Sequence, residues 1–246
     1  MSPQVADFDA DGRLDLITGC FEGGAYLLRG LVDHEFAKPA ALLDRDGDVL
    51  RMGHYWDYDK DTWTDTAKSN MAHELGIAAT PVDWDGDGDL DLLLGANGGR
   101  VALRKNLGDA RKAVWDPQNT PLDLAGRMWT VPNGHAMPVI ADWDGDGKFD
   151  VLSANEKGAV FWWRNVGAPK SPKFDAIATI LDPVERRSAT MRGPGERAQA
   201  HACDYDGDGD LDLLIGDYSR IEAPGTESGR EYHGFVWLLR REPVAK

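Results

Sequence analysis

The stretch Asp83-Trp-Asp-Gly-Asp-Gly-Asp-Leu-Asp91 decides the fold of this chain, because the same pattern occurs four times. Every copy has aspartate at positions 1, 3, 5 and 9, glycine at position 6, an aromatic residue at position 2 and an apolar residue at position 8. The spacing between copies is too long for most helical repeats and suits a four-stranded propeller blade with its loops. The other copies are Asp7–Asp15, Asp142–Asp150 and Asp204–Asp212.

Each acidic run is followed by a short apolar stretch, and a second apolar stretch comes after a turn, as in 90–94 and 101–103. A strand also precedes the run, as in 138–141, and a weaker outer strand fits 40–43 and 177–180. Short apolar stretches that end at glycine favour strands over helices. We therefore predict an all-β fold, a single β-propeller domain over 1–246 with four recognisable four-stranded blades. The repeats span approximately 1–52, 76–125, 133–184 and 197–241, with an insertion at 53–75.

The spacing of the acidic residues predicts calcium binding. Ca²⁺ takes six to eight oxygen ligands in a flexible geometry, and carboxylates at positions 1, 3 and 5 of a tight loop converge on one point. Glycine at position 6 permits the sharp turn, while a backbone carbonyl at position 7 and the carboxylate at position 9 complete the shell. This spacing matches the first part of an EF-hand loop, with strands in place of helices. Metal-free Asx turns are the alternative interpretation.

Two further acidic segments are less regular. Asp57–Asp65 keeps aspartate at positions 1, 3, 5 and 9 but lacks the glycine, so its occupancy by an ion stays open. Asp44–Asp48 has no acid at position 9 and is better explained as a hairpin turn.

From Asp7 to Arg240 the sequence resembles the VCBS and FG-GAP repeat families, most closely in the runs at 83–93 and 204–214. These repeats form calcium-binding β-propellers, as in integrin α-chains. Four blades are fewer than such propellers usually have, so an incomplete or open ring is an alternative, completed by a second copy or by a larger parent chain. The metal ligands that the resemblance implies are Asp7, Asp9, Asp11, Asp15, Asp83, Asp85, Asp87, Asp91, Asp142, Asp144, Asp146, Asp150, Asp204, Asp206, Asp208 and Asp212.

The composition excludes some partners. The formal net charge of −15 disfavours nucleic acid and anionic membranes, and no apolar stretch is long enough to span a bilayer. No signal peptide is visible, yet calcium loops of this kind fill at the millimolar calcium found outside cells. We therefore expect an extracellular or cell-surface protein.

Ligand binding is expected on the face opposite the acidic loops, where the loops at 53–76, 126–137 and 217–234 lie. Aromatic residues there suit stacking on sugars, and Arg or His suits the carboxylate of an acidic glycan. Burial of tryptophans in the core is the alternative for some positions, and His201 is expected to be packed on an inner strand. The candidates are His54, Tyr55, Trp56, Trp63, His73, Trp129, His135, Arg220 and His233.

Three functions are compatible with these features. A binding module for a glycan or an extracellular protein uses every strong feature and is favoured over an enzyme. A lyase that acts on acidic polysaccharide is the second hypothesis, in which His or Tyr removes a proton, although no spacing links these residues. A structural segment of a larger adhesin is the third.

Overall fold

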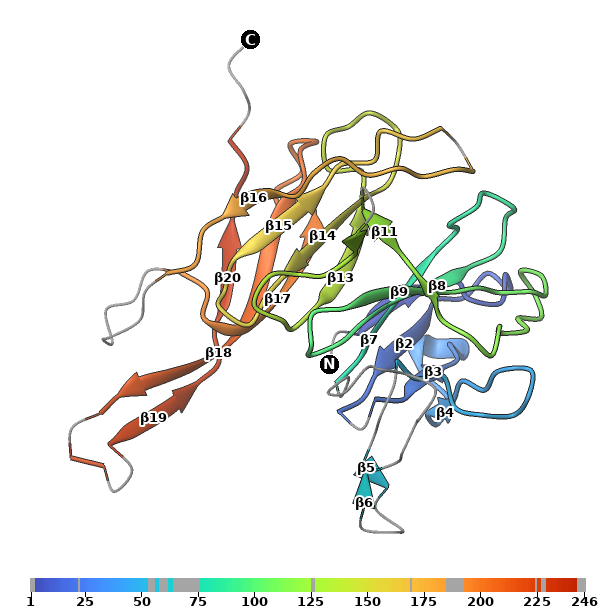
Figure 1. Ribbon diagram of the computed structural model, residues 1–246, viewed down its shortest axis with the longest axis horizontal. Coiled ribbons are helices and arrows are strands. Elements are labelled where there is room, and N and C mark those ends of the chain that lie inside the picture. The colour runs from blue at the N-terminus through green and yellow to red at the C-terminus, as the bar shows by residue number, and fades with distance from the viewer. Residues whose placement is uncertain are drawn as a thin grey trace.

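The computed structural model shows four antiparallel sheets that form the blades of a β-propeller (Figure 1). Helical structure in the described part is confined to the 3₁₀ turn Val32–His34, and no helix there is long and apolar enough to cross a membrane. The structure describes residues 3–21, 23–52, 56–57, 62–63, 76–124, 127–168, 170–184, 193–223, 225–226 and 229–242.

The first three blades share one topology, in which four strands pair in chain order. The first blade contains β1 (Gln4–Ala6), β2 (Asp15–Gly19), β3 (Ala25–Leu28) and β4 (Ala40–Ala41). The second contains β7 (Ala78–Val82), β8 (Asp91–Gly95), β9 (Val101–Arg104) and β10 (Thr120–Pro121). The third contains β13 (Met137–Ala141), β14 (Asp150–Ala154), β15 (Val160–Trp163) and β16 (Ala178–Leu181).

The fourth blade departs from this topology. β18 (Asp212–Glu222) pairs with β17 (Glu196–Cys203) and β20 (Val236–Leu239) in its first half. Its second half pairs with β19 (Arg230–His233) in a hairpin that projects from the blade (Figure 1). Among the described residues, β20 has no outer strand at the place that β4, β10 and β16 occupy in the other blades.

Two small hairpins lie outside the blades. β5 (Trp56–Asp57) pairs with β6 (Thr62–Trp63), and β11 (Asp123–Leu124) pairs with β12 (Arg127–Met128). The segment 44–48 is a hairpin turn, in which the Asp44 N–H donates to the Asp48 carbonyl at 2.8 Å, so that prediction is confirmed.

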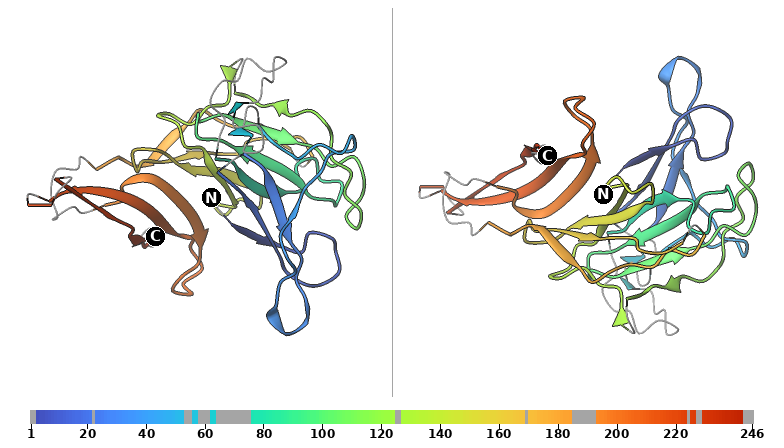
Figure 2. Two further views of the ribbon diagram at one scale, coloured as in Figure 1. Left: turned by 90° about the horizontal axis from the view of Figure 1, so that it is seen from below. Right: turned by 90° about the horizontal axis from the view of Figure 1, so that it is seen from above.

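The first strand of each blade lines the central axis. β7 packs against β1 and β13, and β13 packs against β17, so the first strands of successive blades are neighbours. Three apolar cores fill the spaces between successive blades, and they include Leu94, Val101 and Ile215 respectively. The blades form an arc with the first and fourth at its two ends (Figure 2). The predicted all-β propeller with four blades is confirmed.

One backbone hydrogen bond recurs at the three places where successive blades meet. A backbone N–H just before or within the first strand donates to the previous blade. The donors are Ile77, Ala136 and Ala198, at 3.3, 2.9 and 3.2 Å. The acceptors are the carbonyls of Cys20, Ala96 and Asn155, each just after the second strand.

The residue that ends the second strand must also be small at two of these interfaces. A Cβ on Gly19 or Gly95 would overlap a carbonyl oxygen of the next blade. The glycines that marked strand ends in the sequence therefore permit the close approach of neighbouring blades.

Candidate metal loops and axial pocket

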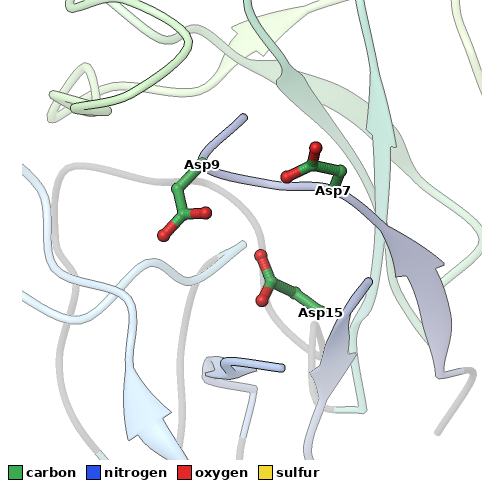
Figure 3. A group of neighbouring side chains, drawn as sticks. All are labelled: Asp7, Asp9 and Asp15. Carbon is green, nitrogen blue, oxygen red and sulfur yellow. The ribbon is translucent and has the colours of Figure 1, made fainter. Parts of the chain in front are cut away.

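Each acidic loop joins the first and second strands of its blade, so all four loops lie at the same end of the propeller. In the first loop the carboxylates of Asp7, Asp9 and Asp15 point into one space (Figure 3). In the other three loops the aspartates at positions 1, 3 and 5 converge. The ligand atoms of each group lie within 4.8 Å of one another. Clustered carboxylate oxygens are a donor set that suits Ca²⁺.

The loop shape depends on two left-handed positions. Glycine at position 6 has φ between 84° and 95° in every loop, as the sequence predicts. Position 4 is also left-handed, with glycine in three loops and Ala10 at φ 52° in the first. A left-handed alanine is strained relative to glycine, so the first loop is the least relaxed. The aspartate at position 1 fixes this shape, since its two oxygens accept the N–H groups of positions 5 and 6, as Asp142 does at 3.0 and 2.9 Å.

The aspartate at position 9 has a structural role that the sequence interpretation missed. Asp150 is fully buried, and its carboxylate accepts the Trp143 N–H at 3.2 Å and the Asn165 N–H at 2.7 Å. It thereby joins the start of the acidic loop to the end of the third strand. Asp15 and Asp212 make the same pair of bonds. Burial raises the pKa of Asp150, and it raises the pKa of Asp91 in the second loop to about 6.

A basic residue directly after the third strand faces the acidic loop in three blades. The Arg164 Nε lies 2.5 Å from Asp144 Oδ2, the Arg240 guanidinium lies 3.5 Å from Asp206, and Arg29 pairs with Asp9. Each partner is the aspartate at position 3. The recurrence of Arg or Lys at this place in every blade was a signal in the sequence that we had not used.

A pocket of about 570 Å³ opens on the axis at the end opposite the acidic loops. Its lining comes from the first and second strands near this end, including Asn97, His135, Arg197 and Tyr218. Gly216 and Val236, the latter at the start of β20, also line it. The Arg197 guanidinium carbon lies 5.9 Å from the centre of the Tyr218 ring.

His135 belongs to the lining of this pocket. It is buried, and its Nδ1 lies 3.0 Å from the side-chain oxygen of Asn97. Its Nε2 is buried without a hydrogen-bond partner. Burial lowers the pKa of His135 to about 4, so the imidazole is neutral at pH 7.

The candidate ligand residues do not gather in one cluster. His135 lines the axial pocket, and His233, on β19, stacks on Phe235, which also lines it. Trp129 is fully buried against Trp163 and Phe174, so it serves the core, which was the alternative for this residue. The side chains at the remaining candidate positions, and most of the run 57–65, lie outside the described residues: His54, Tyr55, Trp56, Trp63, His73 and Arg220.

One packing expectation is wrong. His201 was expected to be packed on its inner strand, but it is exposed. The equivalent residues of the second and third blades, Thr80 and Val139, are buried, and the Thr80 hydroxyl donates to the Pro138 carbonyl of the next blade at 2.6 Å. No blade follows the fourth in the described structure, which leaves this face of β17 open to solvent.

The fold and the loops define a four-bladed β-propeller that carries one acidic loop per blade. Residues 142–215, from the third acidic loop to the second strand of the fourth blade, match the family described as FG-GAP-like repeat. The resemblance predicted from the sequence is therefore confirmed over this segment. No curated protein matched the chain.

Proposed function

We propose that this chain is a calcium-stabilised binding module that works outside the cell, with a glycan or an extracellular protein as its ligand. The observation that carries the proposal is the convergence of three carboxylates in every one of the four acidic loops. The carboxylates of such a group repel one another unless a cation neutralises their charge. The absence of histidine and cysteine from these groups favours a hard cation such as Ca²⁺ over Zn²⁺.

Calcium would stabilise the folded shape of the acidic loops. A bound ion would hold positions 1, 3 and 5 together in three loops and positions 1, 3 and 9 in the first. Position 9 already joins each loop to the third strand. The arginines beside three loops oppose a cation, and this is consistent with weak sites that fill only at millimolar calcium. This affinity range is the argument for an extracellular location.

The metal part of the proposal is tested by calorimetric titration of EDTA-treated protein with CaCl₂, followed by thermal unfolding with and without calcium. We expect calcium binding in the range of about 0.1–1 mM and a higher melting temperature with calcium. Titration with MgCl₂ at the same ionic strength is the control. An unchanged melting temperature and no calcium-dependent heat would refute this part.

The axial pocket is the proposed ligand site. Phe21, Tyr218 and Phe235 offer apolar ring faces, and Arg197 offers a positive charge beside them. Rings of this kind stack on sugars, and arginine pairs with a uronate carboxylate. A glycan array on the calcium-loaded protein tests this part, with Arg197→Ala as the variant that should lose acidic glycans. Binding that is unaffected by Arg197→Ala would place the ligand elsewhere.

One observation favours a second candidate function, a lyase for acidic polysaccharide. The pocket brings His135, Arg197 and Tyr218 together, and a neutral histidine can accept a proton. The binding function is better supported, because it needs no proton-transfer pair. Release of unsaturated sugar from uronate polymers, followed by ultraviolet absorbance, would favour the lyase.

A further inference from the structure

The fourth blade exposes the surface that every other blade buries against its successor. Side chains alternate between the two faces of each second strand, and one face is directed toward the next blade, which we call forward. In the first three blades the forward-pointing residue is Ile17, Leu93 or Leu152, and each is at most 1% exposed. The equivalent residue of the fourth blade, Leu214, is only half-buried.

The third strand shows the same difference more sharply. Strand register makes Ala25, Val101, Val160 and Val236 equivalent. Each pairs with the residue four positions after the last aspartate of the acidic loop. The first three are 0%, 2% and 0% exposed, whereas Val236 is 78% exposed. Leu238, two residues further along β20, is exposed as well.

Gly216, which lies within β18 at the place where β2 and β8 end, completes this surface. A Cβ on Gly19 or Gly95 would collide with the next blade, whereas a Cβ on Gly216 would meet nothing within 4 Å. Gly216, Leu214, Val236 and Leu238 thus form what we call the forward face. The forward face has the same kinds of residue, one glycine and several apolar side chains, that contact the following blade at the internal interfaces.

The complementary surface lies on the first blade of the same chain. Leu16, Thr18 and Tyr26 point away from the second blade and are half-buried. Their equivalents in the second blade, Leu92, Leu94 and Ala102, are at most 3% exposed because the first blade covers them. We call Leu16, Thr18, Tyr26 and Leu28 the rear face.

We propose that the forward face of one copy binds the rear face of the first blade of a second copy, head to tail. The contact would continue the interface that already joins successive blades, and both halves of it are on this chain. The chain's own first blade does not cover the forward face, as the exposure of Val236 and the space beside Gly216 demonstrate. A head-to-tail contact either closes a ring or propagates.

The test measures the molar mass of the full-length chain by light scattering over a range of concentrations in millimolar calcium. We expect a mass above the 27.0 kDa of one chain, rising with concentration. Val236→Asp should remove the forward face and Leu16→Asp the rear face, and each variant should be a monomer. Val32→Asp is the matched control, because Val32 is 72% exposed on an unrelated turn, and it should associate like the native chain.

Mixing the two blocked variants distinguishes a head-to-tail contact from other arrangements. Each retains one intact face, so the mixture should form a one-to-one dimer that grows no further. Gly216→Val is a second forward-face variant, and Tyr26→Lys a second rear-face variant, in case an aspartate prevents folding, which circular dichroism would report. A native chain that is monomeric at every concentration, as a ring closed on its own first blade would be, overturns the proposal. Association of Leu16→Asp alone overturns it too, because the contact would then join two fourth blades.

Discussion

Gly95 and Gly216 hold the same place in two blades, and alanine should have opposite effects at these two positions. Neither glycine has positive φ, so alanine is compatible with both backbones. At Gly95 the new Cβ would overlap the Ala136 carbonyl oxygen and lie 2.5 Å from the Pro138 ring. Both groups belong to the start of the third blade, so relief requires that blade to move.

The size of the effect follows from this contact. Overpacking of this kind costs about 1–3 kcal/mol, and the hydrogen bond from Ala136 N–H to the Ala96 carbonyl, 2.9 Å long, would be weakened by roughly 1 kcal/mol. We expect Gly95→Ala to lose about 2–4 kcal/mol of unfolding free energy, equivalent to roughly 4–16 °C in melting temperature. Gly216→Ala should change stability by no more than about 1 kcal/mol, with a small gain from the restricted unfolded chain.

Thermal and urea unfolding of both variants and the native chain, at a concentration too low for association, provides the measurement. Equal losses at the two positions would refute the assignment of Gly95 to an internal interface and of Gly216 to an open face. A larger loss at Gly216 would mean that its face is covered within one chain.

Three further predictions concern the loops and the pocket. Asp150→Ala should lose about 2–4 kcal/mol of stability with or without calcium, because two buried N–H groups lose their acceptor. Asp144→Asn should lose stability only when calcium is present. Unfolding of both variants in EDTA and in CaCl₂ is the measurement. His135 has a folded pKa of about 4, below its unfolded value of 6.5, so the native state binds fewer protons and stability is lost as pH falls through this window. At pH 4.5 the native chain should have lost about 2–3 kcal/mol of unfolding free energy that His135→Gln retains. His201→Gln, at an exposed position, is the control. Parallel profiles of stability against pH for all three proteins would contradict the burial argument. Arg164→Gln should raise the calcium affinity of the third loop about tenfold, since a unit charge about 6 Å from a divalent ion opposes binding by roughly 1.4 kcal/mol in water. Calorimetry that finds equal or weaker binding would argue against this.

The sequence alone determined the repeat, the strand order within a blade and the four acidic loops. These features follow from local rules, because residue type and spacing fix the turn at position 6, and short apolar stretches bounded by glycine fix the strands. It also predicted that the turns after the second strands lie on the face opposite the acidic loops, since strands in a blade alternate in direction.

Only the tertiary structure decided how each repeated residue is used. Asp150 and Asp144 differ in role because one carboxylate is turned toward two backbone N–H groups and the other toward its loop neighbours. Val160 and Val236 are equivalent in register, yet one is buried and the other is exposed, because burial depends on whether a following blade is present. Local sequence can specify a blade, but contacts between blades join residues far apart in the chain, and these contacts set which surfaces are core and which remain open.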